Sequence, residues 1–73
     1  MKKVAINIEF NNKNITSKYN EFTDEQIETL QKICEEVAKG NISFLKIESE
    51  NNEYYFPEQI LKQSIISLVY DNK

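Results

Sequence analysis

The sequence predicts one two-layer α+β domain, in which a single amphipathic helix packs on an antiparallel sheet. Three observations support this class. The 73 residues leave room for one hydrophobic core, one stretch repeats apolar residues at three- and four-residue spacing, and the flanking segments alternate as strands do. Short connections favour antiparallel neighbours. The expected order is β-β-α-β-β-(turn)-β over a single domain of residues 1–73, with a frayed tail at 71–73.

The N-terminal segment predicts a strand followed by a turn. Its apolar positions Val4, Ile6, Ile8 and Phe10 alternate with Ala5, Asn7 and Glu9. This period of two indicates a strand with one face on the core. The polar residues 11–14 favour a turn, because asparagine tolerates left-handed backbone conformations. Residues 15–22 suit a solvent-exposed second hairpin strand, and an irregular loop is the alternative.

The predicted helix covers about residues 24–39. Thr23 and Gln26 have the spacing of a capping box, and Gly40 stands where a left-handed residue commonly ends a helix. The apolar stripe consists of Ile27, Leu30, Ile33, Cys34, Val37 and Ala38. Because Cys34 lies in this stripe beside two glutamates, and a reactive thiol needs electropositive surroundings, we expect it to act as a small core hydrophobe.

The second half of the chain predicts three further elements. Residues 42–48 and 54–56 form a hairpin around a turn at 50–53, and residues 65–70 form a final strand. Residues 57–61 suit one helical turn, with proline at the favoured first position. The same proline stops the preceding strand or confines it to a sheet edge.

The composition argues against several classes of function. The chain has 12 acidic and 9 basic residues, a net charge of −3, and all nine basic residues are lysines. Arginine is the preferred group for phosphates and guanine edges, so direct nucleic-acid binding is not expected. The chain has no histidine, one cysteine and one glycine. It therefore lacks the commonest general base, a thiolate or imidazole ligand set and a glycine-rich phosphate loop. We expect no enzyme activity, no cofactor and no metal.

The expected location is the cytoplasm. Lys2 and Lys3 could begin a signal peptide, but Asn7 and Glu9 interrupt the apolar run that should follow. No run approaches the roughly 20 apolar residues that a membrane-spanning helix needs. The abundance of Asn, Lys, Ile and Glu indicates an AT-rich coding sequence, as in some bacteria and their phages or plasmids.

Two strands carry more apolar residues than one helix can cover, because a helix packs on only one face of a sheet. Either a curled sheet or the turn at 57–61 covers the extra residues, or some of them form an exposed patch that meets a partner. The candidates for that patch are Phe44, Tyr55, Ile65 and Val69. Glu48, Glu50 and Glu53 gather near the second hairpin turn, as a solvated tip or as an acidic contact surface.

The sequence therefore predicts a non-enzymatic, acidic protein-interaction module that binds another protein or a second copy of itself. One form of this hypothesis is an anti-CRISPR-like inhibitor, encoded by a phage or plasmid, that acts on a host enzyme or defence complex. One alternative is a small structural or regulatory homo-oligomer. The other is a small-ligand binder with its site at an oligomer interface.

Overall fold

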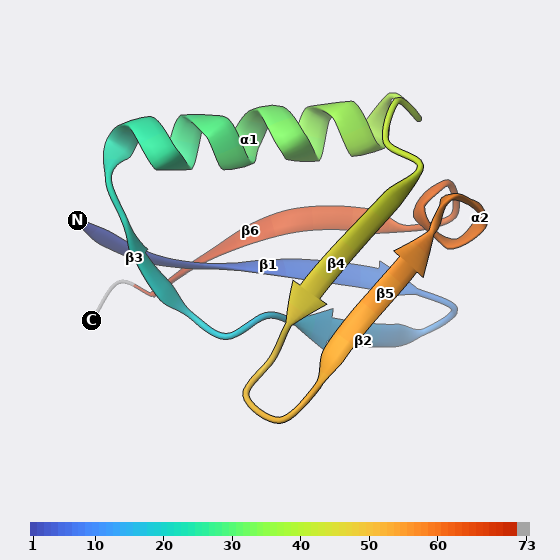
Figure 1. The fold of residues 1–73 in the computed structure, drawn as a ribbon, viewed down its shortest axis with the longest axis horizontal. Helices are drawn as coiled ribbons and strands as arrows, with labels where there is room; N and C mark the ends of the chain where they lie inside the picture. Colours follow the sequence, from blue (N-terminus) through green and yellow to red (C-terminus); the bar gives the residue numbers. More distant parts are fainter. Residues whose placement is uncertain (72–73) are drawn as a thin grey trace.

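In a computed structural model, which describes residues 1–71, the chain forms two antiparallel sheets and one main helix (Figure 1). The elements in order are β1 (Lys2–Phe10), β2 (Lys13–Thr16), β3 (Asn20–Phe22), α1 (Asp24–Ala38), β4 (Phe44–Glu48), β5 (Glu53–Pro57), α2 (Glu58–Leu61) and β6 (Ile65–Asp71). The predicted α+β class is confirmed. The order gains one strand, because the segment expected as a single second strand at 15–22 is divided into β2 and β3. β2 also begins at Lys13, inside the turn expected at 11–14.

β1 is the centre of a four-stranded sheet. One of its edges pairs with β6 along residues 3–9, and its other edge pairs with β3 near the start and with β2 near the end. Ser17 bridges the break between β2 and β3. Its N–H donates to the Ile6 carbonyl at 2.8 Å, and its Oγ accepts from the Ile6 N–H at 2.9 Å. The Ser17 side chain therefore replaces one of the backbone hydrogen bonds that would pair this position with β1.

Three local sequence patterns form the backbone structure that they predict. Asn11 and Asn12 have φ values of 47° and 62°, which fits a two-residue type I′ hairpin between β1 and β2. At the start of α1, the Gln26 N–H donates to the Thr23 hydroxyl, and the Thr23 N–H donates to the Gln26 side-chain oxygen. These two hydrogen bonds form the predicted capping box. α1 ends at residue 38, one residue early, and Gly40 follows with φ 78° in the left-handed region.

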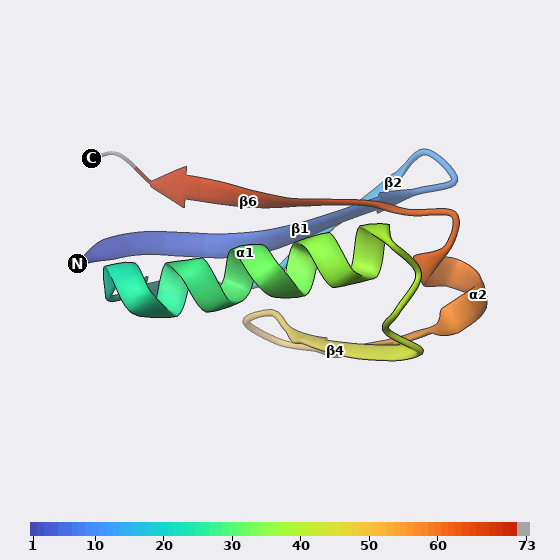
Figure 2. The same cartoon turned by 90° about the horizontal axis from the view of Figure 1, so that it is seen from above.

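β4 and β5 form a second sheet of their own, which differs from the single sheet that the sequence suggested. Within residues 1–71 they pair with each other and with no strand of the first sheet. In Figure 2 this hairpin and the β1–β6 layer lie on opposite sides of α1. A backbone hydrogen bond of 3.0 Å, from the Lys18 N–H to the Glu48 carbonyl, ties the two sheets together. The hairpin packs across the four-stranded sheet because its apolar face, centred on Ile47 and Phe56, needs a surface to cover it.

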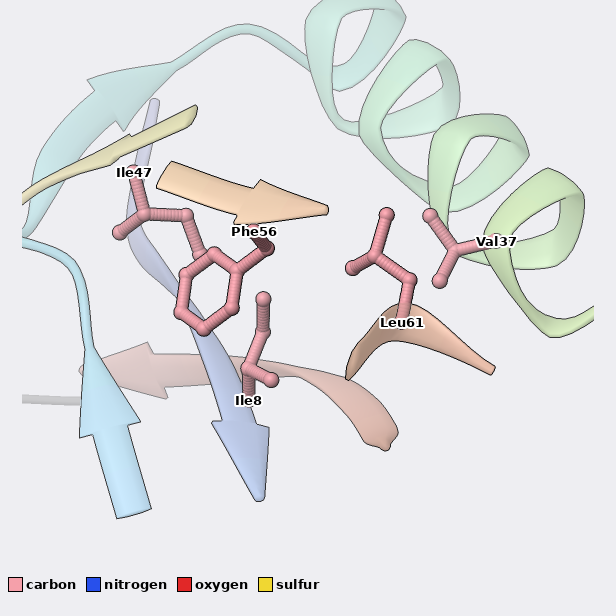
Figure 3. Close-up of a cluster of buried hydrophobic side chains, with 5 residues drawn as sticks. All are labelled: Ile8, Val37, Ile47, Phe56 and Leu61. Atoms are coloured by element: carbon pink, nitrogen blue, oxygen red, sulfur yellow. The ribbon is translucent and has the colours of Figure 1, made fainter. Parts of the chain in front are cut away.

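The main core cluster lies where five elements meet. It contains Ile8 of β1, Val37 of α1, Ile47 of β4, Phe56 of β5 and Leu61 of α2 (Figure 3). The predicted turn at 57–61 is therefore part of the core, although its proline is the N-cap of α2 and not its first helical residue. The inner face of the hairpin and the inner face of β1 cover each other.

Two local expectations are corrected. Ile42, the expected first residue of the strand at 42–48, precedes β4 and packs against the core cluster. The expected frayed tail began at Asp71, but Asp71 is the last residue of β6 and stands opposite Lys3. Its place in the β1–β6 register therefore makes Asp71 part of the strand. The remainder of the expected tail, 72–73, lies outside the described residues.

Candidate interaction surface

The outward side of the β4–β5 hairpin carries the most distinctive arrangement of side chains. Successive strand residues point to opposite sides, so the inner face is made of Leu45, Ile47, Tyr54 and Phe56. The outward side also carries Pro57, opposite Phe44. We call its other five residues the hairpin face: Phe44, Lys46, Glu48, Glu53 and Tyr55. The register places Lys46 opposite Tyr55 and Glu48 opposite Glu53.

Two aromatic rings form the apolar part of the hairpin face. Phe44 is 56% exposed and Tyr55 is 57% exposed. Their ring centroids are 6.1 Å apart at an interplanar angle of 32°, within the range in which aromatic pairs attract. The two rings therefore form one continuous apolar surface that faces the solvent.

Charged groups hold this surface in place. Lys46 Nζ lies 3.4 Å from Glu48 Oε1 and 3.3 Å from Glu53 Oε2, and 6.0 Å from the centroid of the Tyr55 ring. The Tyr55 hydroxyl donates to Glu53 Oε1 at 3.0 Å. Exposed ion pairs of this kind contribute little to folding stability. Their main consequence here is to limit the rotamers of Tyr55.

The same contacts shift the ionisation of three groups. The hydrogen bond from Tyr55, followed by that from Lys46, holds the pKa of Glu53 below its ordinary value. The hydrogen bond to Glu53 raises the pKa of Tyr55, and the bonds to Glu53 and then Glu48 raise the pKa of Lys46. At neutral pH the network therefore combines a neutral phenol with charged carboxylates and ammonium. Because the folded pKa of Glu53 lies below the unfolded one, its contribution to stability is present above the ordinary glutamate pKa and disappears as pH falls through the folded value.

Replacing Glu53 by glutamine is expected to lower the pKa of Tyr55 towards that of free tyrosine. The substitution weakens the hydrogen bond that Tyr55 donates to the Glu53 carboxylate, which is the main cause of the raised pKa, and it removes the negative charge that opposes formation of tyrosinate. The measurement is a pH titration of the Tyr55 ring carbon by NMR. Glu50→Gln, in the adjacent loop, is the control and should leave this pKa unchanged. An unchanged Tyr55 titration in Glu53→Gln would contradict the hydrogen bond.

The structure brings together five of the seven residues that the sequence proposed for an interface. Phe44, Tyr55, Glu48 and Glu53 share the hairpin face, and Glu50 follows in the connecting loop. These three carboxylates, with Tyr55, also line one open polar hollow at the hairpin tip. The acidic cluster expected from the sequence thus borders the exposed aromatic pair.

Ile65 and Val69 lie elsewhere. They stand opposite Glu9 and Ala5 in the β6–β1 register, on the face of the four-stranded sheet turned away from the hairpin. Ile65 is 67% exposed, whereas Val69 is half-buried beside the almost fully covered Ala5. The four apolar candidates therefore do not form one patch, because the hairpin belongs to a different sheet.

The sequence reasoning missed Lys46. It stands two residues from both Phe44 and Glu48, and in a strand this spacing places all three on the same side. That spacing was the signal that could have identified it. The other residue singled out, Cys34, is half-buried, and burial raises the pKa of its thiol, which disfavours the reactive thiolate.

Comparison with known proteins gives no match: no family model, no curated protein and no solved structure is detectably similar to the chain. In the part of the chain that the structure describes, no three His, Cys, Asp or Glu side chains are grouped so that they could hold a metal ion. No helix within residues 1–71 has the length and apolar character needed to cross a membrane.

Proposed function

We propose that the chain is a non-enzymatic, cytoplasmic protein-interaction module that binds another protein through the hairpin face. The observation that carries the proposal is the exposed pair of Phe44 and Tyr55. Aromatic residues are enriched in interface cores and supply much of the binding energy there. Because Tyr55 is already hydrogen-bonded to Glu53 and its ring contacts Phe44, the pair loses less freedom on binding than two unrestrained side chains would. The pair therefore has the properties of a preorganised anchor.

The charges around the anchor define the chemistry of the partner. Glu48, Glu50 and Glu53 carry three negative charges, and Lys46 is the one cation of the hairpin face. The complementary surface has an apolar hollow for the two rings and a rim of lysine or arginine. Two aromatic side chains bury roughly 150–250 Å² each, whereas a specific interface covers about 800 Å² per partner. The contact therefore extends from the anchor onto the polar loop at 49–52, which carries Glu50.

A narrower form of the proposal is an inhibitor, carried by a phage or plasmid, of a host nucleic-acid enzyme or defence complex. Its support is the row of carboxylates at 48, 50 and 53, which can occupy positions that phosphates would occupy on a basic surface. Competition between the chain and DNA or RNA for the captured partner is the expected result. Simultaneous binding of both would contradict phosphate mimicry while leaving the interaction itself in place.

The double variant Phe44→Ser/Tyr55→Ser is expected to weaken partner binding by roughly 100-fold or more, since anchor residues typically contribute at least about 2 kcal/mol each. The matched control is Ile65→Ser/Val69→Ser, which removes apolar residues from the other sheet. Affinity capture from cells that encode the chain identifies the partner, and calorimetry with the purified pair gives the affinities. Far-UV circular dichroism verifies that both variants are folded.

Two results would contradict the proposal. One is a partner that the hairpin variant binds as tightly as the unaltered chain does. The other is self-association: light scattering over a concentration series would show an oligomer for the unaltered chain and a monomer for the hairpin variant. In that case the hairpin face would bind a second copy of the chain.

A further inference from the structure

A cavity of about 260 Å³ opens beside the hairpin, where it borders the core cluster at Ile47. Figure 1 shows the hairpin and α2 towards one end of β1, with β3 and the start of α1 towards the other. Val4 and Ile6 of β1 line the cavity beside β4, although Val4 itself is fully buried. Phe22 of β3 and Leu30 of α1 complete the apolar walls of the cavity.

The rim of the cavity carries a different set of groups. Lys18 contributes from the bend between β2 and β3, Asn20 from the start of β3, and Lys46 and Glu48 from β4. Lys46 is already paired with Glu48 at 3.4 Å and also contacts Glu53. Lys18, by contrast, has no carboxylate within 4.0 Å among residues 1–71. The rim therefore offers one ammonium group that is in no ion pair among residues 1–71, and the same lysine also borders the hollow lined by Glu48, Glu50 and Glu53.

The position of Lys18 is fixed by the fold. Its backbone N–H donates to the Glu48 carbonyl at 3.0 Å, and its own carbonyl accepts from Ser17 Oγ at 3.1 Å. These bonds anchor the start of the Lys18 side chain at the mouth, while the flexible stem lets the ammonium reach across it. The cavity is lined by five apolar and five polar residues. Apolar walls combined with a few placed polar groups are the usual form of a small-molecule site.

We infer that this cavity binds a small monocarboxylate with an apolar body, such as a medium-chain fatty acid. The apolar part contacts Ile6, Phe22 and Leu30, and the carboxylate pairs with Lys18. A monoanion balances the single free ammonium, whereas a dianion would face the carboxylate of Glu48 at the same rim. Ligand pockets are commonly roughly 300–1,000 Å³, so the cavity suits a ligand below drug size. The inference does not depend on a protein partner at the hairpin face.

The test is an NMR titration of the isotope-labelled chain with octanoate and, separately, with 1-octanol. Octanoate is expected to shift the amide signals of Ile6, Ser17, Phe22 and Leu30 in a saturable manner. Lys18→Gln should weaken octanoate binding by about tenfold, the usual effect of losing a charge-assisted hydrogen bond. The same substitution should leave the affinity for 1-octanol unchanged.

Two control variants test whether octanoate binding is specific to the cavity and to Lys18. Lys13→Gln removes an exposed lysine of β2 that does not line the cavity, and it should bind octanoate as the unaltered chain does. Phe44→Ser/Tyr55→Ser should also retain octanoate binding, which distinguishes this inference from the proposed function. Absence of saturable shifts at the cavity residues would overturn the inference. Equal losses in the two lysine variants would overturn the assigned role of Lys18.

Discussion

Replacing Phe56 by alanine is expected to reduce the free energy of unfolding by about 3–5 kcal/mol. Phe56 is only 3% exposed and packs in the core cluster, with the Phe10 ring edge-on at 5.9 Å. A domain of this length has a total stability of roughly 4–11 kcal/mol. The variant is therefore expected to be partly or fully unfolded at room temperature. Urea denaturation followed by far-UV circular dichroism measures the change.

Phe44→Ala is the matched control for this prediction. It removes the same atoms from the same hairpin, but the ring is on the outward side and more than half exposed. The expected loss of stability is below about 1 kcal/mol, as for most surface substitutions. Similar losses in the two variants would mean that Phe44 supports the fold. The main argument that the hairpin face is a contact surface would then fail.

Local sequence signals predicted the local structure well, because the groups that interact are close in the chain. Thr23 and Gln26 are three residues apart, and their reciprocal hydrogen bonds form whenever the helix begins there. Asn11 and Asn12 tolerate positive φ without help from distant residues. Gly40 likewise ends the helix for a backbone reason alone.

Local sequence patterns could not predict that the strands form two separate sheets. Alternation shows which residues of a strand share a side, but it does not show which strands pair. The hairpin therefore appeared as part of one large sheet, and Phe44 appeared to share a face with Ile65 and Val69. The break between β2 and β3 depends on Ser17 bonding to Ile6, eleven residues away. No local pattern indicates such a contact.

The candidate sites differ in the same way. The hairpin face comes from two strands joined by a short turn, so most of its residues could be identified from spacing alone. The cavity takes its lining from β1, the bend after β2, β3, α1 and β4. Its residues are unremarkable one by one, and only the tertiary structure places Lys18 beside Ile6 and Leu30. Sites assembled from many elements are therefore visible only in the folded chain.

Ser17→Ala is expected to reduce the free energy of unfolding by about 1–3 kcal/mol, because it leaves the half-buried Ile6 N–H without its acceptor. The backbone bond from the Ser17 N–H to the Ile6 carbonyl remains possible in the variant, so the bend keeps its contact with β1. The variant should therefore lose local protection at the Ile6 amide as well as global stability. Hydrogen exchange of the Ile6 amide should accelerate more than that of amides elsewhere in β1.

Thr16→Ala is the matched control for Ser17→Ala. The Thr16 hydroxyl bonds to the Asn7 side chain at 2.8 Å, but this bond is exposed and water replaces it readily. The variant should lose less than about 1 kcal/mol and leave the exchange of the Ile6 amide unchanged. If Ser17→Ala also left that exchange unchanged, the Ser17 side chain would not be the acceptor that bridges β2 and β3. The bend that carries Lys18 to the mouth of the cavity would then need another cause.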